Sequence, residues 1–361
     1  CTPFHPPGYT PLKGAPVTSA CTTRIDDFTD LFGQSLPEAC NNTCPVPVEP
    51  DNDYYIAFDN DSDNIPDSVV PTDINGDGVP DSPVAQALAC VGPQGVNGCG
   101  YESPLETMLQ ALNPKAVWND GPDDDNPNPT PFLRDGALLA LAVITDEADC
   151  SVKEYSIMDD VAYQNTDPDS GDPEQSSAIC WNAGVECTGP DVDGVFSECH
   201  SRPEELMQPT WRYTDYLIEE LRENQGKEVI MLGIVGIPLV TDHNPDPPFE
   251  PTAGGVFDLE YRNWRDGQYP LGDILPEEFG NNVNAADKQF DFGIGPGCTG
   301  TDSLGAFTGQ AIPPVRVKEV CEALNTDDKV LCCMESICDE DFSAALRCLT
   351  GIIQENIQPP G

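Results

Sequence analysis

The sequence predicts an α/β fold with a mostly parallel sheet and long loop insertions held by disulfides. Three apolar runs, each long enough for a buried strand, alternate with stretches whose apolar residues recur at helical spacing. This alternation is typical of an open sheet whose parallel strands are joined by helices. The strands and helices that we expect, in chain order, are 137–145, 210–224, 228–236, 313–324, 329–337 and 339–357.

The chain before the first of these strands has little regular pattern. Residues 1–50 hold cysteines among Pro, Thr and Asn, with one short helix expected near 24–32. Residues 99–112, CGYESPLETMLQAL, place leucine and methionine at helical spacing. Pro104 fits the first turn of that helix. We therefore expect disulfide-held irregular structure followed by one helix.

The first expected strand is the continuous apolar run ALLALAVIT at 137–145. A run without polar alternation predicts a strand buried on both faces, as in a parallel sheet under helices. A long loop is expected at 146–208. The amphipathic helix 210–224 then leads to a second buried strand, EVIMLGIVG, at 228–236.

A second long loop, at 237–311, is rich in Pro, Gly and Asp. After it, the helix 313–324 begins at prolines and leads to the third strand, KVLCCMESI, at 329–337. The closing helix 339–357 has acidic residues at its N-terminus, where the helix dipole favours negative charge.

The charge balance is extremely acidic. The 361 residues include 16 Lys and Arg against 63 Asp and Glu, which gives a formal net charge of −47. Such a surface repels nucleic acids and anionic membranes and suits divalent cations or a salty medium. The sequence contains no apolar run of the length that a transmembrane helix needs, so we expect no transmembrane segment.

Sixteen cysteines in a chain with three histidines and no CxxC pair favour disulfides over zinc or redox sites. An oxidising compartment is therefore expected: the periplasm, the cell surface or the medium. The chain begins at a cysteine, which predicts a processed, trimmed or incomplete chain, with a lipid-modified N-terminal cysteine and outer-membrane association as an alternative. The disulfide candidates are Cys1, Cys21, Cys40, Cys44, Cys90, Cys99, Cys150, Cys180, Cys187, Cys199, Cys298, Cys321, Cys332, Cys333, Cys338 and Cys348.

Two groups of cysteines allow a more specific prediction. Cys332 and Cys333 are adjacent in an expected strand, so they face opposite sides and bond to different partners, with Cys321, Cys348 and a loop cysteine as the options. The cysteines of the 146–208 loop are expected to pin that loop over the sheet.

An Asp-rich insert at 51–83 carries two similar units of alternating oxygen side chains. Such alternation lets a short loop curl around one cation, and Gly78 permits the tight turn. The insert resembles the calcium repeats of thrombospondin type 3, which implies structural calcium; an acidic linker without an ion is the alternative. The expected ligands are Asp59, Asp61, Asp63 and Asp67 in the first unit, and Asp73, Asn75, Asp77 and Asp81 in the second.

Acidic residues also follow the first strand directly. Asp146, Glu147 and Asp149 come after the run at 137–145. Ligands of open α/β sheets bind at the carboxyl ends of the strands. These acids are therefore candidate site residues by position alone.

Several segments in order resemble the von Willebrand factor A (VWA) domain proteins of myxobacteria and their relatives, which are secreted or outer-membrane proteins. The segments are NGCGYESPLETMLQAL, FLRDGALLALAVITDEADCS, CWNAGVEC, RYTDYLIEEL, KEVIMLGIVG, PPVRVKEV and ESICDEDFSAAL. The resemblance implies a doubly wound, mostly parallel Rossmann-like sheet. It divides the chain into a disulfide-rich N-terminal part at 1–98 and a VWA-like core at 99–361.

The resemblance also implies a metal-ion-dependent adhesion site. Asp146 matches the aspartate of that site, and Glu102 falls near its threonine position, with Glu147 as a further ligand. The ion would be calcium or magnesium. The family's Asp-x-Ser-x-Ser segment is absent from this sequence, so the site is either completed by another chain or inactive.

The absent segment belongs to a strand that lies beside the first expected strand in this fold. Without it, 137–145 would be an exposed apolar edge, which stable proteins avoid. We therefore expect the chain to be the carboxyl-terminal portion of a longer domain. The slot beside 138–144 would be filled by a cleaved partner chain, by a neighbouring subunit or by 53–59.

The function that these observations predict is that of an extracellular or cell-surface calcium-binding VWA-like domain, which mediates protein–protein adhesion or assembly. The alternative is a structural subunit of an extracellular assembly with no working adhesion site. A hydrolase is less well supported. With three histidines and no G-x-S-x-G motif, a nucleophile with a base is disfavoured, and a metal-dependent hydrolase would need a bound catalytic metal with an open position. We assign no catalytic residue.

Overall fold

The computed structural model describes residues 17, 19–29, 33–51, 56, 65–74, 76–96, 100–113, 116, 133–203 and 206–356. The chain forms two compact units. One comprises Cys1–Gly100 and Thr107–Leu133, and the other comprises Tyr101–Glu106 and Arg134–Gly361. The helix α3 (Pro104–Ala111) spans the division between them.

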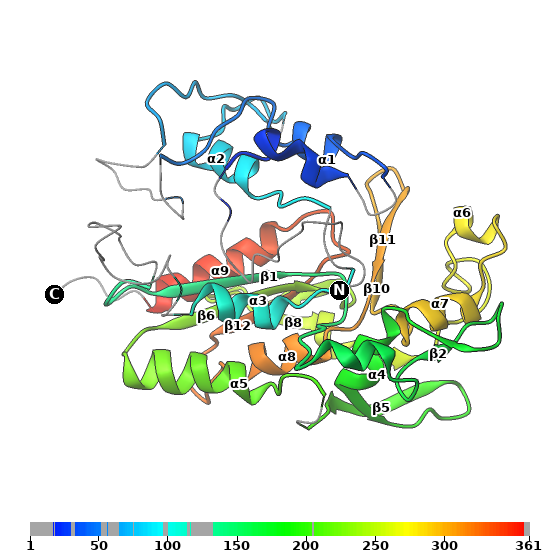
Figure 1. Cartoon of the computed structure of the whole chain (residues 1–361). Helices are drawn as coiled ribbons and strands as arrows, with labels where there is room; N and C mark the ends of the chain where they lie inside the picture. The colour runs from blue at the N-terminus through cyan, green and yellow to red at the C-terminus, as the bar shows by residue number, and fades with distance from the viewer. Residues whose placement is uncertain are drawn as a thin grey trace. The chain divides into compact units, whose positions relative to one another are not determined.

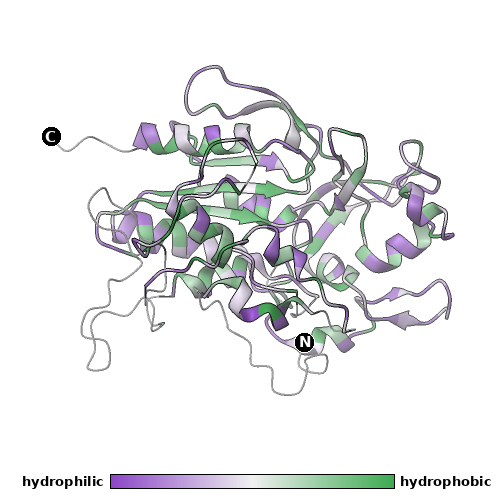
Figure 2. Ribbon diagram, turned by 90° about the horizontal axis from the view of Figure 1, so that it is seen from above, coloured by the Kyte–Doolittle hydropathy of each residue, from purple (hydrophilic) through white to green (hydrophobic). Residues whose placement is uncertain are grey.

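The larger unit is a mixed α/β structure built on a parallel three-stranded sheet (Figure 1). Its strands are β1 (Leu139–Ile144), β6 (Val229–Val235) and β12 (Cys332–Ser336), in the order β1-β6-β12. All three apolar runs therefore form strands, and β6 is buried along its whole length. The strands are coloured green along much of their length in Figure 2.

Helices lie on both faces of this sheet (Figure 1). On one side are α8 (Val315–Glu322) and a helix that starts as α5 (Trp211–Thr214) and continues with π-helical hydrogen bonds in η3 (Asp215–Asn224). On the other side is α9 (Ser343–Asn356), which packs against β6 and β12. The expected helices are thus present, with somewhat shorter bounds than the sequence pattern predicts.

Disulfides join the third strand to a helix on each face. Cys332 bonds to Cys321 on α8, and Cys333 bonds to Cys348 on α9. The prediction that the two adjacent cysteines face opposite sides is confirmed, because successive residues of a strand alternate between its faces. Both partners lie on flanking helices, and neither comes from a loop.

The prediction that the first strand is buried on both faces is wrong. Leu139, Leu141 and Val143 are buried, whereas the intervening Ala140, Ala142 and Ile144 are exposed. The reason is the position of β1 at the edge of the sheet: α9 packs on β6 and β12, and within the described part of the chain the corresponding face of β1 stays exposed. An apolar run shows that a strand can be buried on both faces, but it does not show whether other elements pack on those faces.

The region 146–208 is not the long loop that we expected. It contains η2 (Tyr155–Asp159), the short pair β2 (Asn165–Thr166) and β3 (Pro173–Glu174), and α4 (Ala178–Gly184). It also contributes β4 (Val185–Thr188) and β5 (Val195–Ser201), which form an antiparallel sheet with β9 (Tyr261–Arg262).

The region 237–311 is also more regular than we expected. It forms the hairpin β7 (Val240–His243) and β8 (Pro251–Gly254), the turn η4 (Gly255–Phe257), and the hairpin β10 (Cys298–Thr301) and β11 (Phe307–Ala311). Between them lie α6 (Pro276–Phe279) and α7 (Ala285–Phe292), and α7 begins with a capping box. A separate hydrophobic core that includes Trp181 and Trp264 holds this part together.

The smaller unit is stabilised by disulfides around a small core. Its described helices are η1 (Cys21–Phe28), α1 (Glu38–Asn41) and α2 (Pro83–Val91). Cys21 bonds to Cys40, and Cys44 bonds to Cys90. All four sulfur-bearing residues belong to one buried cluster with Phe28 and Ala87.

Seven disulfides occur in the described part of the chain, which confirms the disulfide prediction for these fourteen cysteines. Cys1 and Cys99 lie outside the described residues. Such a density of disulfides is typical of extracellular-type proteins. Among the described residues, no helix has the length and apolar character needed to cross a membrane.

Candidate functional site

The carboxyl end of β1 brings together the acids that the sequence placed there. The Thr145 N–H still bonds to the Ile234 carbonyl at 3.2 Å, which continues the sheet pairing by one residue. The buried Thr145 hydroxyl donates to Glu102 Oε2 at 2.8 Å and accepts the N–H of Glu147 at 3.3 Å. A single hydroxyl therefore holds segments that are 43 residues apart in the sequence.

Two of these acids act electrostatically on the third, Glu147. Burial, followed by the negative charges of Glu102 and Asp146, raises the pKa of Glu147 from 4.5 to about 7. Glu102 and Asp146 are exposed and Glu147 is half-buried, so the group is accessible from solvent. The structure thus places Glu102 and Asp146 near enough to Glu147 for their negative charges to raise its pKa, and we call these three residues the acidic cluster.

The chemistry of this cluster suits a hard divalent cation, because calcium and magnesium prefer carboxylate oxygens. The geometry fits less closely: within the described residues, no group of three or more His, Cys, Asp or Glu side chains is gathered tightly enough to hold a metal ion. The charges of Glu102 and Asp146 act on Glu147 over distances longer than a coordination bond. A calcium or magnesium ion at these residues stays a prediction.

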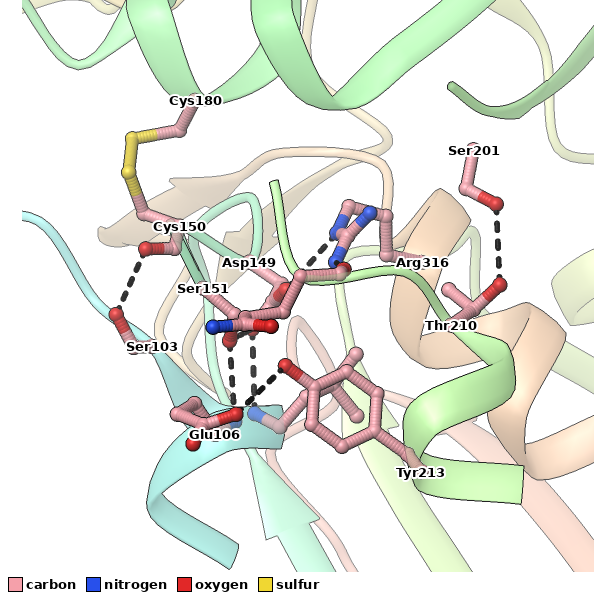
Figure 3. A network of polar contacts seen from close by, with 12 residues as sticks. Ser103, Glu106, Asp149, Cys150, Ser151, Cys180, Ser201, Thr210, Tyr213 and Arg316 are labelled. Atoms are coloured by element: carbon pink, nitrogen blue, oxygen red, sulfur yellow. Dashed lines mark hydrogen bonds and ion pairs between the residues drawn. A yellow bond between two sulfur atoms is a disulfide. The ribbon is translucent and has the colours of Figure 1, made fainter. Parts of the chain in front are cut away.

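The segment that carries Glu102 is bound to the loop after β1 by several hydrogen bonds. The Cys150 N–H donates to the Glu102 carbonyl at 2.7 Å, and the Ser103 hydroxyl donates to the Cys150 carbonyl at 2.8 Å (Figure 3). Cys150 is also bonded to Cys180 at the start of α4. These contacts fix the position of Glu102 relative to the end of β1.

Asp149 is not available as a cation ligand. Its Oδ1 accepts the N–H of Leu105 at 3.2 Å and the hydroxyl of Ser151 at 2.7 Å, and its Oδ2 accepts Arg316 Nε at 2.9 Å. Its side chain is fully buried. The sequence pattern grouped Asp149 with Asp146 and Glu147, but Asp149 instead helps to cap α3.

Three further polar residues near the site were not predicted from the sequence. Arg316, from α8, is buried against Asp149 and also donates to the Gln208 carbonyl (Figure 3). Arg212 forms a two-pronged contact with Glu106, with 3.0 Å for each hydrogen bond, and the Tyr213 hydroxyl donates to the same carboxylate at 3.2 Å. The sequence gives no local indication of these pairs, because the two residues of each pair are far apart in the chain and meet only in the folded protein.

The second Asp-rich unit forms a closed loop. Asp73 accepts the N–H of Gly76 at 2.7 Å and that of Gly78 at 2.8 Å, and Asp81 accepts the N–H of Ile74 at 2.8 Å. Gly78 has a φ of +86°, as the tight turn requires. Asp77 accepts the N–H of Val79. The alternating aspartates therefore curl the chain as predicted, and calcium within this curl stays a prediction.

The other predicted calcium ligands cannot be placed in the same way. Asn75 of the second unit and Asp59, Asp61 and Asp63 of the first lie outside the described residues. Asp67 is described and is exposed.

No protein-family model, curated protein or solved structure matches this chain. The resemblance to VWA domains therefore rests on the sequence segments alone.

Proposed function

We propose that this chain is an extracellular, cation-binding protein that contacts another protein at the carboxyl end of β1. The observation that carries the proposal is the convergence of Glu102, Asp146 and Glu147, with the pKa of Glu147 raised to about 7. Carboxylates that repel one another at a solvent-accessible edge gain stability when a cation binds among them.

In this proposal, exposed Asp146 is the main ligand, and Glu102 and Glu147 add oxygen atoms. A cation held by few protein ligands keeps open positions, and one of these would accept a carboxylate of the partner. This is the adhesion mechanism that the VWA resemblance implies, on a doubly wound sheet of that family. The Asp-x-Ser-x-Ser ligands would have to come from another chain.

We also propose a structural calcium ion in the loop of the second Asp-rich unit. The loop closed by Asp73 and Asp81 has exposed carboxylates and little apolar material to bury. A bound ion would order such a loop, and the millimolar calcium of extracellular media would fill even a weak site.

Calcium titration by isothermal calorimetry tests the two sites separately. We expect Asp146→Asn and Glu147→Gln to remove one binding event, and Asp73→Asn to remove another. Glu340→Gln, at an exposed acid elsewhere, serves as the control and leaves both events intact. The proposal fails for the β1 site if the Asp146 and Glu147 variants bind calcium as the unchanged protein does.

A structural subunit without a working adhesion site is the second candidate. It is favoured by the edge position of β1, where the described residues place a strand on one side only. In this case calcium and disulfides would only rigidify the protein, and the titration would show no event that depends on Asp146.

A further inference from the structure

The outer edge of β1 has backbone groups without partners in the described part of the chain. Leu139 donates its N–H to Glu228 and Thr145 donates to Ile234, so the odd-numbered residues of this segment point toward β6. Because backbone groups alternate along a strand, those of Ala140, Ala142 and Ile144 point to the opposite edge. The described strands include none on that side.

The same three residues also present an uncovered apolar face. In register beside them on β6 lie Ile230, Leu232 and Ile234, which are 0%, 1% and 4% exposed. Ile144 is 64% exposed. On this face of the sheet, the side chains of β6 are therefore buried and those of the neighbouring β1 are exposed. Natural proteins normally protect a six-residue apolar edge strand of this kind.

The charges around this edge indicate what would cover it. Glu102, Asp146 and Glu147 lie at its carboxyl end, and the whole chain carries a formal charge of −47. Two copies of so acidic a chain repel each other, which disfavours pairing of β1 with a second β1. A partner with a positive charge at the acidic end is complementary to this edge.

We propose that β1 accepts an extended segment of a partner protein as a further strand, with apolar side chains beside Ile144 and a Lys or Arg beside Glu147. Main-chain hydrogen bonds to Ala140, Ala142 and Ile144 provide affinity, and the acidic cluster provides selectivity. The inference rests on the proposed function for its use of that cluster. This strand contact is an alternative to the cation-bridged contact of the proposed function. A divalent cation and the basic side chain compete for the same carboxylates, so calcium releases the strand and leaves the cluster open to a partner carboxylate.

The test uses the full chain and synthetic probes. The probes are three fluorescein-labelled peptides of alternating valine and threonine: one with lysine at the amino end, one with lysine at the carboxyl end, and one with glutamate at both ends. Binding is measured by fluorescence polarisation in chelator and in calcium. We expect one lysine peptide to bind, according to strand direction, with roughly tenfold or greater preference over the glutamate peptide.

The decisive variant is Ala142→Pro. Its ring removes an N–H that points away from β6, so the existing sheet is kept while pairing at the outer edge is blocked. Ala142→Thr is the matched control, because it retains the N–H and favours a strand. We expect loss of peptide binding in the first variant and retention in the second. Equal binding by the two variants overturns the proposal.

Further outcomes separate this inference from the others. Slow hydrogen exchange at Ala140, Ala142 and Ile144 in the isolated chain would show that the edge is already filled, which overturns the proposal. Sedimentation of the chain as a dimer that Ala142→Pro dissolves would assign the edge to a second copy instead. Stronger peptide binding in calcium would contradict competition at the acidic cluster, whereas failure of calcium to bind at all would contradict only the proposed function.

Discussion

The guanidinium of Arg316 lies 2.9 Å from the carboxylate of Asp149, and both side chains are almost completely buried. The two residues are 167 positions apart in the sequence. Through this pair, α8 is tied to the loop after β1 and, by the bond from Leu105 to Asp149, to the start of α3. The acidic cluster at the end of β1 thus lies next to a buried network of polar contacts.

Arg316→Met is expected to destabilise the protein strongly. Removing one partner leaves the Asp149 charge buried without compensation, which typically costs about 3–5 kcal/mol in the free energy of unfolding. Urea denaturation measures the loss. The control is Arg265→Met, which breaks a half-exposed pair with Glu260 and should cost about 1 kcal/mol or less. Similar losses in the two variants would contradict the supporting role of the buried pair.

Thr145→Val is expected to loosen the acidic cluster. The substitution keeps the shape of the side chain but removes both hydrogen bonds of the hydroxyl, to Glu102 and from Glu147. We expect a loss of about 1–2 kcal/mol in the free energy of unfolding. Thr145→Ser keeps the hydroxyl and should lose less. If serine and valine are equivalent in thermal denaturation, the hydroxyl does not hold the two segments together.

Glu147 should make the metal-free protein less stable as the pH rises. Between pH 4.5 and about 7, the folded protein holds a proton at Glu147 that the unfolded chain has released. The free energy of unfolding therefore falls with rising pH over this window, by roughly 1–3 kcal/mol from this group, and its contribution levels off above pH 7.

The measurement is chemical denaturation in chelator from pH 4.5 to 8, compared between the unchanged protein and Glu147→Gln. The variant should lack this part of the decline and should be the more stable protein at pH 8. Glu186→Gln, at an exposed position, is the control. Parallel curves for the unchanged protein and Glu147→Gln would refute the raised pKa.

Removal of the Cys333–Cys348 disulfide is expected to destabilise the larger unit. The bond closes a segment of sequence separation 15, and loss of such a cross-link costs about 3 kcal/mol through the entropy of the unfolded chain. Both cysteines are buried, so their replacement by alanine also leaves cavities. Thermal denaturation of Cys333→Ala/Cys348→Ala measures the effect.

The matched control is Cys187→Ala/Cys199→Ala, because that bond has a similar sequence separation of 12 but its cysteines are only half-buried. We expect a smaller decrease in melting temperature there. A larger decrease in the control would mean that the bond from β12 to α9 contributes little.

The sequence predicted the parts of the fold that depend on local pattern. The runs around Leu141, Leu232 and Cys333 were recognisable as strands because each is continuously apolar. The opposite bonding of Cys332 and Cys333 followed from the two-residue period of a strand. The clustering of Asp146 with Glu102 followed only from a family resemblance.

The remaining features depend on partners that are distant in the chain. The strands β4 and β5 carry polar and half-exposed residues, so nothing in their composition distinguished them from a loop. The sequence pattern predicted Asp149 as a site residue, but in the fold its carboxylate is paired with Arg316, which is distant in the sequence. Burial of β1 was overestimated because an apolar run contains no information about whether its strand lies at the centre or the edge of a sheet.

The paired disulfides at Cys332 and Cys333 also set how the chain responds to tension. A pull at the carboxyl end would reach Cys348, cross to Cys333, pass one peptide bond to Cys332 and cross again to Cys321. The residues between the bonded cysteines, 322–331 and 334–347, would carry no load along the chain, whereas the part of α9 that follows Cys348 would carry it. Between Cys348 and Cys321 the force would therefore pass through two disulfides and a single peptide bond, so this part of the chain could not be extended without breaking a covalent bond.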